Sequence, residues 1–174
     1  RHAAGPAAES PAEVARPATG ARPASGGVRV NIDARRPAGW LSDYRLFKDL
    51  RRQTPNDDVV PYRLNSPQFV DDAQARHYVY LPPSASAVYH DSEVFDFPVG
   101  SVLVQSLFYP KDLNDPAAGE RTVETRLLIH QNKGWVAVPY LWNEDGSDAR
   151  RVVVGGKTDV RWRDDDGNLR ELAF

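Results

Sequence analysis

The feature that most constrains the fold is a run of strand-like segments between residues 101 and 142. Segment 101–109 has apolar residues on both alternating faces, which is typical of a central strand covered on both sides. Segment 121–130 alternates instead, which predicts a strand with one buried face. The polar tetrapeptide 131–134 then predicts a hairpin turn into a third strand over 135–142.

Further segments of strand character flank this run. They cover residues 77–81, 152–154, 159–162 and 169–174, with a weaker edge strand at 28–33. Residues 59–69 contain two prolines and predict an irregular connection. Short strands at regular spacing, separated by Gly, Asn and Pro turns, predict an all-β fold, either an antiparallel β-sandwich or a half-open barrel.

One short N-terminal helix is expected ahead of these strands. Ser42 is a suitable N-cap, and Leu46, Phe47 and Leu50 form a single apolar stripe. A Thr-Pro pair ends the pattern. The sequence therefore predicts a helix over residues 43–52.

The first 27 residues differ in composition from the rest. Seventeen of them are Ala, Pro or Gly and none is aromatic, so this segment buries too little apolar surface to offset its ordering entropy. All 17 aromatic residues lie after it. We expect an extended, flexible leader over 1–27 and a single β-domain over 28–174.

The compartment is indicated by what the chain lacks. It contains no Met and begins at Arg1, which indicates a processed product whose signal peptide has been removed. No apolar run approaches the roughly 20 residues of a membrane span. The net charge of -2, with both signs interspersed, does not suggest a nucleic-acid partner. We expect a periplasmic or extracellular protein without a direct membrane span.

Catalytic motifs are not recognisable. The chain has no Gly-x-Ser-x-Gly elbow and no nucleophile paired with a base. Residues 155–158 resemble the end of a phosphate-binding loop, but Arg151 stands where that pattern needs glycine. Because there is no Cys, disulfides, thiolate metal sites and covalent c-type haem are excluded. We predict no catalytic residue and no cofactor in this chain.

A metal site is one alternative. His77 and His90 could meet across a hairpin beside Asp91 and form a zinc- or copper-like cluster. The simpler interpretation is two half-exposed histidines. Two acidic loops, 143–148 and 164–168, lack the ligand spacing of an EF-hand and are most simply solvated turns, although a looser calcium site stays open.

The segment Pro-Tyr-Leu-Trp-Asn-Glu at 139–144 is the candidate partner-binding site, because it combines aromatic anchors with polar neighbours. Its proposed contact residues are Pro139, Tyr140, Trp142, Asn143 and Glu144. Exposed rings would equally suit a carbohydrate. A β-domain of this size also needs large core residues, and we expect at least one of Trp135 and Trp142 to be in the core.

Several motifs carry a resemblance to a known family. The two main ones are residues 95–104 (FDFPVGSVLV) and 124–130 (ETRLLIH), and further matches extend over about 41–162. They resemble the β-domain of a poorly characterised family of exported bacterial proteins, often dihaem cytochromes, in which the β-domain precedes a c-type haem segment. Residues 97–104 (FPVGSVLV) more loosely resemble the β-domain of P460-type cytochromes. This chain has no Cys-x-x-Cys-His motif, so no haem ligand can be assigned to any of its residues.

The resemblance implies an exported β-module that associates with electron-transfer proteins. The leading hypothesis is a non-catalytic accessory subunit or module that docks on a cytochrome or a membrane electron-transfer complex. Its partner would be an exported or membrane-anchored, haem-bearing protein. The alternatives are a carbohydrate- or small-ligand-binding β-sandwich and a metal-dependent enzyme that uses His77 and His90.

Overall fold

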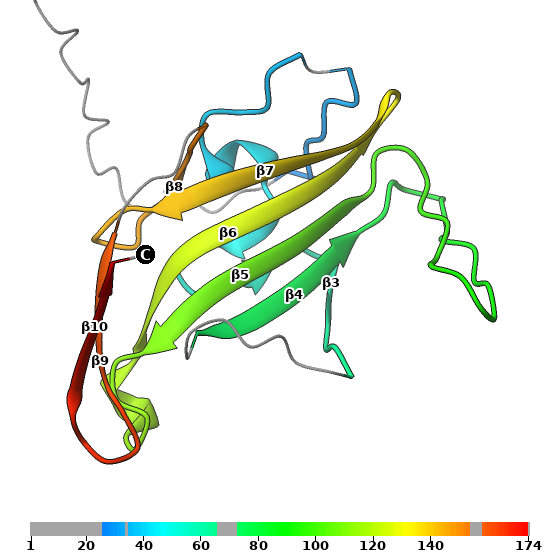
Figure 1. Cartoon of the computed structure of the whole chain (residues 1–174). Coiled ribbons are helices and arrows are strands. Elements are labelled where there is room, and N and C mark those ends of the chain that lie inside the picture. The colour runs from blue at the N-terminus through cyan, green and yellow to red at the C-terminus, as the bar shows by residue number, and fades with distance from the viewer. Residues whose placement is uncertain (1–25, 34, 66–72, 154–157, 174) are drawn as a thin grey trace, which may run out of the picture.

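A computed structural model describes residues 26–33, 35–65, 73–153 and 158–173. Its main element is a six-stranded antiparallel sheet in which each strand pairs with the next one along the chain (Figure 1). The strands are β3 (Val59–Tyr62), β4 (Gln74–Tyr80), β5 (Val102–Pro110), β6 (Glu120–Gln131), β7 (Gly134–Trp142) and β8 (Ala149–Arg151). The predicted antiparallel all-β fold is confirmed.

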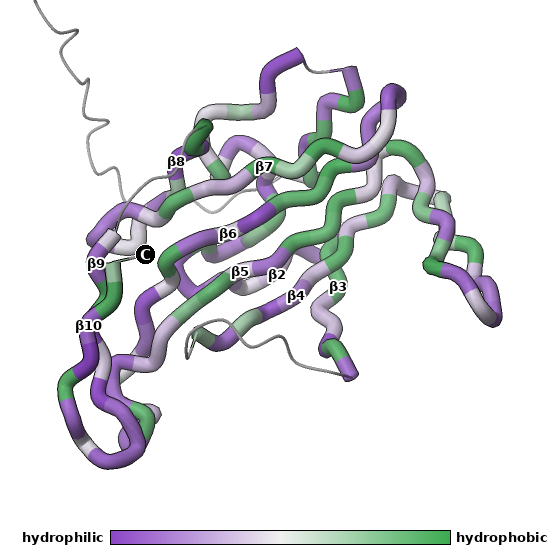
Figure 2. The backbone as a smooth tube through the Cα atoms, viewed as in Figure 1, coloured by the Kyte–Doolittle hydropathy of each residue, from purple (hydrophilic) through white to green (hydrophobic). Residues whose placement is uncertain are grey.

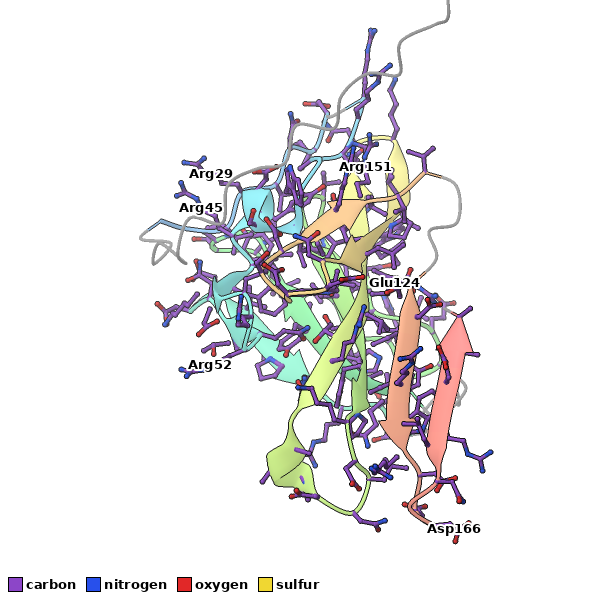
Figure 3. All side chains as sticks on the ribbon, turned by 90° about the vertical axis from the view of Figure 1, so that its left-hand side faces the viewer. Arg29, Arg45, Arg52, Glu124, Arg151 and Asp166 are labelled. Carbon is purple, nitrogen blue, oxygen red and sulfur yellow. The ribbon has the colours of Figure 1, made fainter. Side chains whose placement is uncertain are left out.

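The remaining elements lie on the two faces of this sheet. The N-terminal layer, which we define as the described residues between 26 and 55, contains the 3-10 helix η1 (Leu41–Tyr44) and the short pair β1 (Phe47–Asp49) and β2 (Thr54–Pro55). The hairpin of β9 (Asp159–Arg163) and β10 (Leu169–Ala173) lies on the opposite side of the sheet (Figure 3). A second 3-10 helix, η2 (Pro116–Ala118), precedes β6.

The sheet face that packs against the N-terminal layer, called here the inner face, holds the main core. Alternate residues of each strand point into it, because side chains in a strand have a period of two. The buried members are Leu41, Tyr44, Leu46, Phe47, Val59, Tyr78, Tyr80, Val102, Val104, Leu127, Ile129, Val138, Tyr140, Trp142 and Ala149. Thr125 lies inside it and bonds to both Ser106 (2.8 Å) and the indole of Trp142 (2.9 Å).

The opposite face, called the outer face, is covered at one end by the β9–β10 hairpin. Leu107, Tyr109 and Val123 of the sheet pack there against Val160 and Trp162 of the hairpin. The rings of Tyr109 and Trp162 lie 4.8 Å apart, centroid to centroid. Strand β5 therefore has buried residues on both faces, as its sequence predicts, and the hairpin turn into β7 is also confirmed by the pairing of Gln131 with Gly134.

The predicted helix over residues 43–52 is wrong. The helical segment is only η1, and it ends at Arg45, which adopts a left-handed conformation (φ 55°). Ser42 does not cap a longer helix, because its backbone N–H and its hydroxyl both donate to the carboxylate of Asp148 at 3.2 and 2.6 Å. Leu46 and Phe47 instead enter the core from an extended segment.

Three strand boundaries also differ from the prediction. Residues 28–33 form no strand; Arg29 N–H bonds to the carbonyl of Tyr44, and this irregular segment packs on the core. Strand β3 forms despite Pro61, because it lies at the edge of the sheet, where a missing N–H is tolerated. The strand expected at 152–154 lies earlier, as β8. Most of the leader and residues 154–157 lie outside the described part of the chain.

Candidate functional site

A row of apolar side chains crosses the part of the outer face that the β9–β10 hairpin does not cover. The strand register aligns one residue from each of β3 to β7, so all five side chains point to the same face. This apolar row consists of Val60, Val79, Leu103, Leu128 and Ala137. It is a preformed stripe on five neighbouring strands.

The apolar row is accessible in the described structure. The side chain of Val60 is 57% exposed, Ala137 is exposed, and the three central residues are partly exposed. None of the five belongs to either of the two buried clusters formed by the described residues. Figure 2, which looks onto this face, shows hydrophobic stretches on neighbouring strands and in the loop beyond them.

That loop, residues 82–99, projects from the sheet between β4 and β5 and is called here the arm (Figure 1). A chain of aromatic contacts links it to β7. Tyr89 contacts Phe95 (5.6 Å between centroids), Phe95 contacts Phe97 (6.1 Å), and Phe97 meets the ring of Trp135 edge-on (6.0 Å). Trp135 in turn stacks on His130 at 4.5 Å, so the aromatic chain continues onto the sheet.

Exposed apolar side chains concentrate in this region. Tyr89 is 66% exposed, Phe95 50% and Trp135 40%, and Val94 of the arm reaches 85%. Among the described residues, most exposed large apolar side chains belong to the arm, to Trp135 or to the apolar row. This concentration of exposed apolar side chains makes the region the candidate functional site.

Polar groups border the apolar row on the side away from the arm. The next register row contains His77, Gln105 and Arg126. Arg126 is exposed and pairs at 2.7 Å with the buried carboxylate of Glu124. Partial burial lowers the pKa of His77, so this imidazole is neutral at pH 7. Arg150 on β8 is exposed as well, so the border carries two exposed arginines, one of them paired with Glu124.

The predicted contact segment 139–144 is divided between the two faces. Tyr140 and Trp142 lie in the core with 0% and 5% exposure, so these two rings cannot anchor a partner, and the assignment of both as contact residues is corrected. Pro139 faces outward opposite Arg126, and Asn143 and Glu144 lie in the turn before β8. The expectation that at least one of Trp135 and Trp142 is in the core is confirmed.

The histidines do not form the metal cluster that was considered as an alternative. His77 lies on β4 beside the ring of Tyr62, at 5.5 Å between centroids. His90 lies in the arm, where its Nε2 contacts the carboxylate of Asp96 at 2.8 Å, and Asp91 is exposed beside it. Across the described residues, no group of three or more His, Asp or Glu side chains is placed to hold a metal ion.

Comparisons of the chain with known protein families, with curated proteins and with solved structures gave no match. The family resemblance therefore stays a prediction that depends on the motifs quoted above. In the part of the chain that the structure describes, no helix has the length and apolarity needed to cross a bilayer.

Proposed function

We propose that this chain is a non-catalytic docking module of an exported electron-transfer assembly, and that the apolar row and the arm contact a haem-bearing protein partner. The observation that carries the proposal is the apolar row, five aligned side chains on the outer face that belong to neither buried cluster. The export and the haem of the partner rest on the family resemblance.

The anatomy of the surface supports contact with a protein. Its centre is apolar and partly aromatic, and its border carries charged side chains, which is the usual arrangement of a protein interface. Trp135 and the arm rings supply the residue types that most often dominate binding energy. Because the apolar row stands on paired strands, little conformational entropy is lost when a partner binds.

The charges at the two ends of this surface define the partner further. Arg126 and Arg150 lie beyond one side of the apolar row, whereas the arm at the other side carries Asp91, Glu93 and Asp96. A complementary partner presents an apolar patch with carboxylates near Arg126 and basic groups near the arm. Such complementarity fixes the orientation of the complex more than its affinity.

Site-specific photo-cross-linking tests this proposal. A benzophenone amino acid is introduced at Ala137 or Val60, the exposed ends of the apolar row, and the full chain is irradiated in cells that export it. The matched control carries the same probe at Leu169, which is 65% exposed on β10. We expect the first two positions, but not the third, to give an adduct that stains for haem peroxidase activity.

Two other results would contradict the proposal. Equal adducts from Leu169 would mean that the apolar row has no special role, and an adduct with twice the mass of the chain would identify a second copy as the occupant.

Leu128→Arg places a charge in the centre of the row and should reduce the haem-stained adduct about tenfold or more. The melting temperature of this variant reports whether the fold is retained.

A carbohydrate is the second candidate ligand, and the arm is the observation that favours it. Tyr89, Phe95 and Trp135 present exposed rings of the kind that stack on sugars. Affinity electrophoresis in gels that contain soluble polysaccharides would then retard the wild-type chain but not Tyr89→Ala. Equal migration of the two proteins in every gel would remove this candidate.

A further inference from the structure

The net charge of the N-terminal layer differs in sign from that of the other described residues. The N-terminal layer, residues 26–55, contains seven Arg or Lys and three Asp, a net charge of +4. Described residues outside this layer, 56–65, 73–153 and 158–173, contain eleven Arg or Lys and seventeen Asp or Glu, a net charge of -6. The N-terminal layer is therefore the positive side of a protein whose total charge is -2.

Three arginines of this layer point away from the sheet on the same side. Figure 3 shows Arg29, Arg45 and Arg52 along the margin opposite the β9–β10 hairpin, and we call these three residues the arginine surface. Arg52 has only a long contact with Asp49, 3.9 Å from Nε to the carboxylate. For Arg29 and Arg45, no ion pair with a described carboxylate is formed.

This surface lacks the apolar anchors of a protein interface. None of the exposed large apolar side chains among the described residues comes from the N-terminal layer. A protein partner would need such a centre, and single-stranded nucleic acid would need exposed rings for stacking. A layer of anionic headgroups needs only positive charge within a Debye length.

We propose that the arginine surface docks this domain on a membrane surface rich in anionic lipid headgroups. Because the N-terminal layer and the outer face lie on opposite sides of the sheet, a domain bound in this way directs the apolar row and the arm away from the bilayer. The membrane contact is independent of the docking function proposed above, and either can hold without the other.

Vesicle flotation with the full chain tests the proposal. The probes are vesicles of phosphatidylcholine alone and vesicles with about one third phosphatidylglycerol. We expect binding only to the anionic vesicles, lost as salt rises above the order of 0.1 M. Each arginine close to an anionic membrane surface raises the vesicle–water partition coefficient about fivefold. The variant R29E/R45E/R52E should therefore bind the anionic vesicles at least about tenfold more weakly than the wild type.

The control variant is K111E/K133E/R161E, which changes the net charge equally at three exposed cations outside the N-terminal layer. It should retain most of the binding. An equal loss in both variants would show that only net charge matters, and binding to phosphatidylcholine alone would show apolar insertion; either result overturns the proposal. Leu128→Arg changes the apolar row and leaves the arginine surface intact, so it should bind vesicles as the wild type does. A failure of the proposed docking function can therefore be told apart from a failure of the membrane contact.

Discussion

Tyr140→Ala is expected to lower the free energy of unfolding by about 3–5 kcal/mol, the cost of removing a large core side chain. The ring of Tyr140 is fully buried and meets the ring of Tyr44 edge-on at 6.0 Å. Its hydroxyl donates to the carbonyl of Ala38 at 2.8 Å, and 3.0 Å separates it from the hydroxyl of Tyr44. One side chain thus ties β7 to the N-terminal layer.

Tyr140→Phe separates the hydrogen bonds from the packing. It keeps the ring and removes the hydroxyl, so we expect a loss of about 1–2 kcal/mol. Burial raises the pKa of Tyr140 above its ordinary value, so the phenol is protonated at neutral pH and can donate these bonds.

Urea denaturation of the three proteins measures these differences, with Trp135→Ala as the control on the same strand. Trp135 is 40% exposed, so its removal should cost about 1 kcal/mol or less. If Tyr140→Ala retained the stability of the wild type and weakened partner binding instead, the ring would be a contact residue and its placement in the core would be wrong.

The strands of the sheet could be predicted because their signals are local. Alternation of apolar residues defines β6 and β7, and the turn residues between Gln131 and Gly134 define their hairpin. The same signals do not say which face is covered. Leu103 and Leu107 look alike in the sequence, yet Leu107 is fully buried under the β9–β10 hairpin and Leu103 is partly exposed beyond its end.

The helix was mispredicted because the deciding contact is not local. An apolar stripe of Leu46, Phe47 and Leu50 fits a helix, but it fits an irregular layer on a sheet equally well. The structure decides between them through the bonds from Ser42 to Asp148, two residues 106 positions apart. No window around residue 42 contains that information.

The site was only partly predictable for a related reason. Successive side chains of a strand point to opposite faces, so the sequence of β7 alone places Trp135 and Pro139 on one face and Tyr140 and Trp142 on the other. Which set faces a core depends on the N-terminal layer, which covers the inner face. The apolar row was missed because its five members come from five strands and meet only in the sheet register.

Gly100→Ala is expected to destabilise the fold by about 2–4 kcal/mol, through backbone strain and a steric clash together. Gly100 joins the arm to β5 and has a φ of +95°, where a residue with a Cβ is strained. A Cβ at this position would lie 2.9 Å from Cγ of Pro82, at the other base of the arm. The proline ring cannot swing aside as a flexible side chain can, so the backbone must move.

Gly167→Ala is the matched control, because Gly167 has a similar φ of +79° but no atom within 4 Å of the added Cβ. It should show the strain alone, about 1–2 kcal/mol. The difference between the two variants in thermal or urea denaturation then measures the contact with Pro82.

The bond from Gly100 N–H to the carbonyl of His130 (2.7 Å) crosses the same junction, so a backbone shift there should also speed amide exchange in the arm. Equal costs for the two variants would mean that the base of the arm is loosely packed and that the aromatic chain to Trp135 is not held in place from Gly100.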